Sequence, residues 1–216
     1  GHAFFTLSLG MGTIMVYGSY MPEHQSIPSA TVSVAFLDTL IALIAGMAIF
    51  PLVFASGLEP GSGPGLLFET LPIAFSDMWG GAFFGTGFFV LVSIAALSSS
   101  ISLIEPGIAW LEKLGITRIA ATIGLALLCW LGGVASIYSD EVFNTLDFLT
   151  ANIMLPLGGL LIAIFVGWKL GYTRVRKEIT GISNGVFNVW FVVLRFITPI
   201  GVIVVFYESI KGLFGA

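Results

Sequence analysis

Charged residues are scarce in this sequence. They make up 9% of its 216 residues, whereas soluble domains carry roughly a quarter. Hydrophobic residues make up 57%, and the mean hydropathy is +1.04. We therefore expect lipid, not water, to be the main solvent of this chain. The net charge of -4 leaves no basic excess, which argues against a nucleic-acid partner.

Cysteine and catalytic motifs are also nearly missing. Cys129 is the single cysteine and lies in an apolar run, so no disulfide framework or CxxC metal site can form within this chain. We interpret it as a buried small hydrophobic residue. HExxH does not occur, and the GxSxG spacing at 181–185 does not follow a predicted strand, as a nucleophile elbow would. Zinc and serine hydrolysis therefore lack their usual parts. We therefore do not expect this chain to be an enzyme. The catalytic alternative is an intramembrane hydrolase that pairs a serine of residues 98–100 with His2.

Long apolar runs are abundant. An α-helix needs about 20 apolar residues to cross the hydrocarbon core of a bilayer. Six runs meet this requirement, and their boundaries are soft by a few residues. The predicted spans are 3–21, 28–57, 82–112, 117–138, 142–169 and 186–212. The sequence thus predicts an all-α, polytopic membrane protein.

Lys and Arg in the loops predict the orientation, because these residues are retained on the cytoplasmic side. Lys113 and Arg118 flank the third loop. The fifth loop carries Lys169, Arg174, Arg176 and Lys177. We expect these two loops to face the cytoplasm. The second loop, 56–79, has no Lys or Arg, and the fourth contains Asp140 and Glu141, so both are predicted to lie outside.

Two loops are predicted to contain short helices. In the second loop, a Gly, Ser and Pro cluster at 61–65 precedes the apolar stretch Leu66 to Phe75. That stretch is too short to span, so we predict an extracellular loop helix within 61–78. A short basic helix is predicted at 172–179 on the inner surface, with a solvated loop as the alternative.

Glycines and hydroxyls interrupt the first predicted span. It contains Thr6, Ser8, Gly10 and Gly12 where the bilayer centre should be. Each glycine costs a helix about 1 kcal/mol relative to Ala, so the pair predicts a local break. Broken backbone in a bilayer is tolerated only where it is buried in protein or lines a cavity. Close helix packing through small residues is the alternative interpretation.

The third predicted span has a polar face. At helical spacing, this face contains Ala95, Ser98, Ser99, Ser102 and Leu103. Two adjacent hydroxyls there could supply oxygens to a hard cation. The alternative is that each serine hydrogen-bonds back to its own helix.

Three acids lie inside or near the predicted membrane region: Asp38, Glu105 and Asp147. A bare carboxylate at the bilayer centre costs about 2.5 kcal/mol or more. Asp38 in particular therefore needs an ion, a water cavity or an Arg from elsewhere. Arg195, in the last span, is more easily structural because its long side chain can snorkel.

The order of these features resembles the neurotransmitter:sodium symporter family. The run Phe4 to Gly12, FFTLSLGMG, continuing to Tyr17 and Tyr20, resembles the sixth helix of that family. Later matches are Asp38 in the seventh helix, residues 95–100 in the eighth, Leu146 to Phe148 in the tenth and Arg195 to Pro199 in the eleventh. The similarity covers essentially the whole chain, and FFTLSLGxG is its most specific motif.

The resemblance implies a LeuT-type fold of two inverted five-helix repeats with discontinuous helices at the midplane. This chain would supply the C-terminal half. Residues 1–170 would form the second repeat, helices six to ten, and 171–216 the cytoplasmic loop helix and helix eleven. The expected partner is the N-terminal half, helices one to five of the same transporter.

The resemblance also implies roles for individual residues. The implied sodium ligands are Thr6, Asp38, Ala95, Ser98 and Ser99. The implied substrate-binding residues are Phe5, Thr6, Ser8, Met11, Ser99 and Leu103. Asp147 would help to close an outer gate. We expect sodium-coupled symport of hydrophobic amino acids, both aliphatic and aromatic, across the cell inner (plasma) membrane. Two Na⁺ ions are expected to bind. The alternative is a channel or receptor-like subunit built on the same helices.

Several positions depart from the family pattern. Met11 replaces a common Phe, and the flexible thioether chain favours a broad hydrophobic range, as in the bacterial multi-hydrophobic amino-acid branch. Asp38 stands where many members carry Asn, Ala42 where chloride-dependent members carry Ser, and His2 where Gln is usual. We therefore expect no chloride requirement. Lys113 stands where some relatives have the acidic member of an inner gate, so that gate is not carried over.

Overall fold

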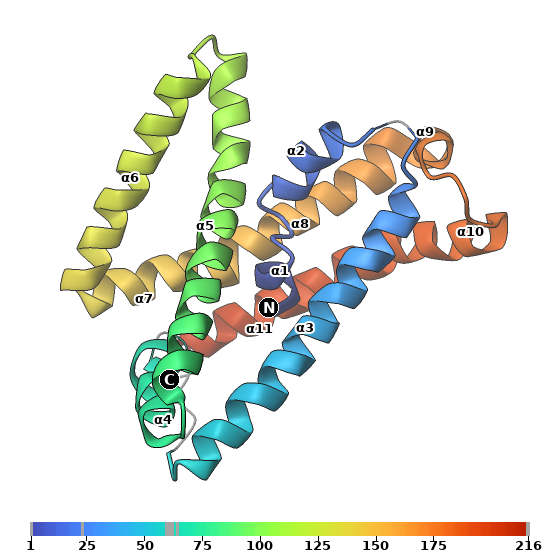
Figure 1. Cartoon of the computed structure of the whole chain (residues 1–216). Helices are drawn as coiled ribbons and strands as arrows, with labels where there is room; N and C mark the ends of the chain where they lie inside the picture. Colours follow the sequence, from blue (N-terminus) through green and yellow to red (C-terminus); the bar gives the residue numbers. More distant parts are fainter. Residues whose placement is uncertain (1, 23, 59–62, 64, 215–216) are drawn as a thin grey trace. The chain divides into compact units, whose positions relative to one another are not determined.

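The computed structural model describes residues 2–22, 24–58, 63 and 65–214, and 2–3, 208–210 and 212–214 by backbone alone. Every regular element in this part of the chain is helical. The chain divides into two compact units, residues 1–31 with 101–216 and residues 32–100 (Figure 1). Each unit is described separately below.

Five helical stretches are long and apolar enough to cross a membrane. They are Ile27–Ala55, Gly81–Lys113, Arg118–Tyr138, Asp140–Glu178 and Asn184–Tyr207. These stretches match five of the six predicted spans. The first predicted span is instead divided into two short helices, α1 (His2–Thr6) and α2 (Thr13–Ser19). The prediction of an all-α, polytopic membrane protein with a discontinuous first helix is confirmed.

Two long rods of the first unit are interrupted by π-helical turns. The first rod comprises α7 (Asp140–Phe148), η2 (Leu149–Met154), α8 (Leu155–Ile164) and η3 (Phe165–Leu170). The second comprises α10 (Asn184–Val192), η4 (Val193–Ile197) and α11 (Thr198–Phe214). In Figure 1, the orange α8 packs beside the red α11. Each π turn holds an extra residue and so changes the direction in which the following side chains point.

The helix α9 (Gly171–Glu178) lies between the two rods in sequence and packs on α10. Gly171 has a φ of +75°, a conformation that glycine adopts without strain, and the chain turns there into α9. Val175 is buried with Phe187 and Phe191 of α10. The Arg176 guanidinium donates to the carbonyl oxygens of the following loop and to the Asn184 side chain. α9 is therefore fixed along one face and leaves its other face exposed.

A tight turn joins α5 (Gly81–Lys113) to α6 (Arg118–Tyr138). Thr117 caps α6, because its hydroxyl accepts a hydrogen bond from the Ala120 N–H at 3.4 Å. On α6, Cys129 is exposed, so the prediction of a buried cysteine is wrong for this chain. An apolar residue on a membrane helix can face lipid, and its hydrophobicity then does not require burial in protein.

The second unit contains α3 (Ile27–Ala55) from residue 32 onward and α5 up to residue 100. Between them lie η1 (Leu66–Thr70) and α4 (Leu71–Asp77). The Phe75 ring of α4 packs on Phe88 and Phe89 of α5, with ring centroids 5.5 and 6.4 Å away. These helices fall within the predicted loop helix 61–78, of which positions 61, 62 and 64 lie outside the described residues. The loop helix is thus fixed to α5 by aromatic packing.

Candidate functional site

The break between α1 and α2 begins with a helix-ending hydrogen-bond pair. The Ser8 N–H donates to the Phe5 oxygen at 3.2 Å, and the Leu9 N–H donates to the Phe4 oxygen at 2.9 Å. Ser8 has a φ of +50°, in the left-handed region. This combination is the Schellman motif, which usually has glycine where Ser8 stands. The chain therefore leaves α1 by a defined turn.

The two glycines of the break have different surroundings. Gly10 and Gly12 have φ values of +90° and +85°, which are unfavourable for residues with a Cβ. A Cβ on Gly10 would overlap the Leu155 carbonyl oxygen and lie 2.7 Å from the Gly159 nitrogen. At Gly12, the nearest atom would be the Pro106 Cβ at 3.8 Å. Gly10 is thus required by space as well as by conformation, and Gly12 by conformation.

A glycine pair on α8 supports the break from the other side. A Cβ on Gly158 would overlap the Gly10 carbonyl oxygen, and a Cβ on Gly159 would overlap the Phe4 ring. The backbone of the break and the backbone of α8 are therefore in direct contact. Small residues permit such close approach between membrane helices. Both interpretations of the first span hold, because its glycines allow a break and close packing together.

An apolar cavity of about 290 Å³ lies beside the break. Phe4 of α1 and Ser8 and Leu9 of the break line it. The facing helices contribute Gly159, Leu194 and Val202, among others. Non-helical backbone at membrane depth thus borders a cavity, as expected for broken membrane helices. Of the predicted substrate residues, Ser8 lines this cavity, whereas Phe5 and Met11 do not.

The predicted sodium ligands are distributed over both units. Thr6 ends α1 in the first unit, whereas Asp38 is half-buried on α3 in the second. On α5, the Ser98 hydroxyl donates to the Ala95 oxygen at 2.8 Å. This is the back-bonding alternative, and it also brings two of the predicted ligands into contact. Ser99 lies exposed beside them, and the ligand set as a whole stays a prediction.

The remaining predicted residues are largely exposed. Phe5 is 57% exposed and Leu103 is 47% exposed, while Met11 is half-buried. Asp147 is exposed on α7. Large exposed apolar side chains mark surfaces that face lipid or another part of a protein. The His2 side chain, needed for the hydrolase alternative, lies outside the described side chains.

A buried carboxylate connects three helix ends. Glu105 of α5 is 5% exposed and receives two hydrogen bonds of 2.8 Å from Arg118 at the start of α6. The Tyr20 hydroxyl, just after α2, donates to the same carboxylate at 3.0 Å. Arg118 also pairs with Glu112 at 3.2 Å. The loop flanked by Lys113 and Arg118 was predicted to face the cytoplasm from its basic residues. This network therefore lies at the predicted cytoplasmic end of the protein.

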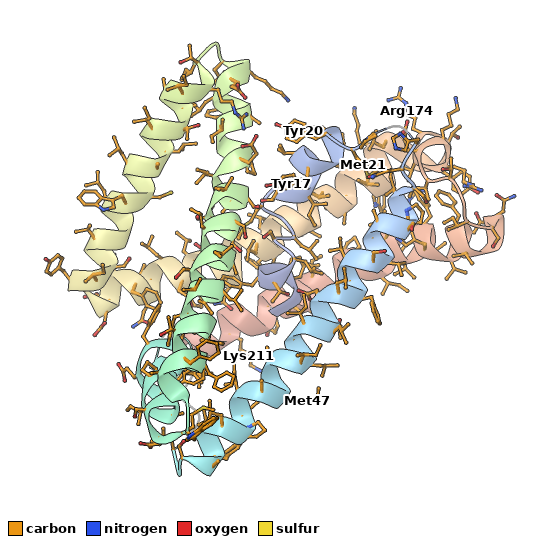
Figure 2. The ribbon with its side chains drawn as sticks, in the orientation of Figure 1. Tyr17, Tyr20, Met21, Met47, Arg174 and Lys211 are labelled. Carbon is orange, nitrogen blue, oxygen red and sulfur yellow. The ribbon has the colours of Figure 1, made fainter. Side chains whose placement is uncertain are left out.

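The sequence indicated Glu105 as one of three acids inside or near the membrane region but did not predict this network. One signal was available: an acid in the last turns of an apolar helix is followed, across a tight turn, by an Arg that begins the next helix. Figure 2 shows Tyr17 and Tyr20 on the side of α2 that faces α5. The Tyr17 and Ser102 hydroxyls lie 2.9 Å apart. The α2 helix is therefore attached to α5 at two successive levels.

One polar group on α2 is buried near these contacts. Thr13 is 4% exposed, and its hydroxyl oxygen has no hydrogen-bond partner among the described residues. Thr13 and Tyr17 are four residues apart and share a helix face. This face of α2 therefore combines buried and hydrogen-bonded hydroxyls.

Comparison with known proteins agrees with this architecture. Residues 1–214 match the model of the sodium:neurotransmitter symporter family. The chain belongs to that family, as its resemblance predicted, and has the LeuT-type fold.

Particular relatives extend over nearly the whole chain. The uncharacterized sodium-dependent transporter YhdH of Bacillus subtilis is 36% identical over 97% of this chain. An uncharacterized sodium-dependent transporter of Haemophilus influenzae is also 36% identical over 97% of it. The crystal structure of MhsT in complex with L-phenylalanine has a TM-score of 0.89 and 41% identity over 96% of this chain. The chain spans about half the length of these proteins: 50% of YhdH, 49% of the Haemophilus protein and 50% of MhsT.

Proposed function

We propose that this chain is the helix six to eleven half of a sodium-coupled symporter for hydrophobic amino acids. The observation that carries the proposal is the break at residues 7–12, held against α8 by direct backbone contact. Discontinuous helices of this kind bind substrate and coupling ions near the bilayer midplane. The sodium-dependent relatives and the L-phenylalanine complex of MhsT support the choice of ion and of substrate class. The partner would be helices one to five of the same transporter, in the cell inner (plasma) membrane.

The proposed mechanism is alternating access. Backbone oxygens outside regular helix can bind an ammonium group and Na⁺, so each ligand orders the break for the other. The Glu105 network would hold the cytoplasmic end closed by attaching Tyr20 to Arg118. Asp147 would act at the outer end. We propose two sodium sites with ligands among Thr6, Asp38, Ala95, Ser98 and Ser99, each site completed by the other half.

Uptake into proteoliposomes tests the proposal against a channel. The complete transporter should accumulate L-phenylalanine against its gradient when Na⁺ is supplied outside, and the initial rate should saturate with substrate. Equal uptake after Na⁺ is replaced by K⁺, or a rate that never saturates, would contradict a sodium-coupled transporter. An active-site serine probe should leave the rate unchanged if the hydrolase alternative is wrong.

Replacing Ser98 and Ser99 together by Ala should weaken sodium binding. Two candidate oxygen ligands are lost. If each is worth as much as a hydrogen bond to a charged group, about 1.5 to 3 kcal/mol, the half-saturating Na⁺ concentration should rise about a hundredfold or more. Na⁺ titration of substrate binding measures it. Ser100→Ala is a matched control, because the Ser100 hydroxyl donates to the Leu97 oxygen at 2.8 Å. The same midpoint in both variants would return these serines to a helix-packing role.

Met11→Phe should narrow the proposed substrate pocket. A rigid ring replaces an adaptable chain, so binding of Trp should weaken about fivefold or more relative to Leu, within the cost range of overpacking. Competition binding with Trp and Leu measures the ratio. Met47→Phe, on exposed α3 surface (Figure 2), should leave the ratio unchanged. Equal losses for Trp and Leu in Met11→Phe would mean that Met11 does not limit substrate size.

Asp38 should make transport independent of chloride. Each Na⁺ ion bound beside a zwitterionic substrate adds one positive charge, and an ionised side chain can neutralise one such charge in place of a bound anion. Na⁺-driven uptake should persist in gluconate medium, and Asp38→Asn should reduce it by about tenfold. Full activity of Asp38→Asn without chloride would reduce Asp38 to a structural hydrogen-bonding role.

A further inference from the structure

Arg195 of η4 packs against Trp168 of η3. We propose that Arg195 binds the phosphate group of an anionic phospholipid in the cytoplasmic leaflet, with Lys169 as a second cation. This inference concerns a surface that the proposed transport mechanism does not use.

The Arg195 side chain is held in place by aromatic rings. Its guanidinium carbon lies 4.8 Å from the centre of the Trp168 ring and 5.5 Å from that of Phe196. The Trp168 indole N–H donates to the Arg195 carbonyl oxygen at 3.3 Å, which fixes the ring. Gly167 permits this approach, because a Cβ there would lie 3.2 Å from the Arg195 Cα. The guanidinium therefore has a preformed position.

Among the described residues, no anion compensates the charge of Arg195. Arg195 lies inside the apolar span Asn184–Tyr207, where a lone cation is costly. In the part of the chain that the structure describes, no carboxylate pairs with it, since both described ion pairs belong to Arg118. Its Nε is buried without a hydrogen-bond partner. The aromatic contacts offset part of this cost, and a bound anion would offset the rest.

The surroundings favour a lipid phosphate as that anion. The Lys and Arg bias places this end of the rods on the cytoplasmic side, where leaflets contain anionic lipids that basic pockets between membrane helices bind. Lys169 is exposed next to Trp168, and Trp168 itself is 57% exposed, as expected for an aromatic residue at the interface. Arg174 projects outward from α9 (Figure 2), which adds to the positive potential. The planar guanidinium offers two parallel donors that match phosphate oxygens.

Lipid retention in native mass spectrometry tests the site. The complete transporter should retain phosphatidylglycerol in preference to phosphatidylcholine. Arg195→Gln should lower the retained phosphatidylglycerol about tenfold, because charge-assisted hydrogen bonds are lost. Arg195→Lys should retain an intermediate amount of phosphatidylglycerol, since Lys keeps the charge but lacks the paired donors. Inorganic phosphate added in phosphatidylcholine nanodiscs should not raise the melting temperature of the wild type.

Arg174→Gln is the matched control for diffuse attraction, and it should lose much less phosphatidylglycerol than Arg195→Gln. Equal losses in both variants, or none in Arg195→Gln, would overturn the site. If Arg195→Gln kept its bound phosphatidylglycerol but melted at a lower temperature in every lipid, the partner of Arg195 would be a protein carboxylate. That result would also overturn the proposal.

A wild-type measurement covers the case in which Arg195→Gln fails to fold. Brominated phosphatidylglycerol should quench Trp emission more than brominated phosphatidylcholine, and Trp168→Phe should remove the difference. Equal quenching by the two lipids in the wild type would contradict the proposal.

Discussion

Gly10→Ala should remove the folded, ligand-binding state of the complete transporter. The φ of +90° costs a residue with a Cβ about 1 to 2 kcal/mol. The methyl group would also overlap the Leu155 oxygen, and overpacking adds about 1 to 3 kcal/mol. Together these terms are a large share of a typical stability of about 5 to 15 kcal/mol. We expect loss of the monodisperse peak in size-exclusion chromatography, or a melting temperature lowered by many degrees.

Two further glycine variants test whether the loss depends on the contact between the break and α8. Gly158→Ala should have a similar effect, because its methyl group would overlap the Gly10 oxygen from the side of α8. Gly18→Ala is the control: apart from its chain neighbours and its own helix backbone, no atom of the described residues lies within 4 Å of its Cβ position. Ala is also the better helix former by about 1 kcal/mol. If Gly10→Ala melted like Gly18→Ala and still bound substrate, the close contact of the break with α8 would not be required.

Arg118→Gln should open the cytoplasmic end of the transporter. It leaves the Glu105 carboxylate buried without its cation, and removing one partner of a buried pair is strongly unfavourable. The Arg118 side chain is 53% exposed, so solvent screening reduces the effect. We expect maleimide labelling of Met21→Cys, in a Cys129→Ala background and inside-out vesicles, to become about tenfold faster.

A second variant removes the carboxylate of the Arg118–Glu105 pair instead of the cation. Glu105→Gln should have the smaller effect, since Arg118 is half exposed to solvent and keeps its ion pair with Glu112. Lys113→Gln is the control, because it removes a cation at the same helix end that forms no ion pair within the described residues. Equal labelling rates in all three variants would mean that the network does not close this end.

The sequence predicted the fold well where hydrophobicity decides it. Apolar length alone located the five long spans, because a bilayer requires about 20 such residues per helix. The break was predictable from Gly10 and Gly12, since two glycines weaken a helix locally. The Schellman turn at Ser8 was not, because left-handed backbone at serine depends on the surrounding contacts.

The site was predicted less completely, for a different reason. Contacts such as Gly10 with Gly158, or Arg195 with Trp168, join residues far apart in sequence, and no local pattern encodes their distance. The π turns η2, η3 and η4 were likewise not predictable, because one extra residue per turn leaves hydrophobic periodicity almost unchanged over so short a stretch. The sodium and substrate residues came from family resemblance, and they stay predictions.

The contact of Gly10 with α8 has a mechanical consequence, because it makes the break a fulcrum. With seven residues, α2 is about 10 Å long, so a rotation of roughly 15° about Gly10 would move its far end by about 3 Å. Tyr20 stands at that far end, and its 3.0 Å hydrogen bond to Glu105 would be broken by such a displacement. Close to the fulcrum, the same rotation would move the backbone by only a fraction of an ångström. A rocking α2 would thus release the predicted cytoplasmic end while the turn around Ser8, a proposed binding residue, stays nearly in place.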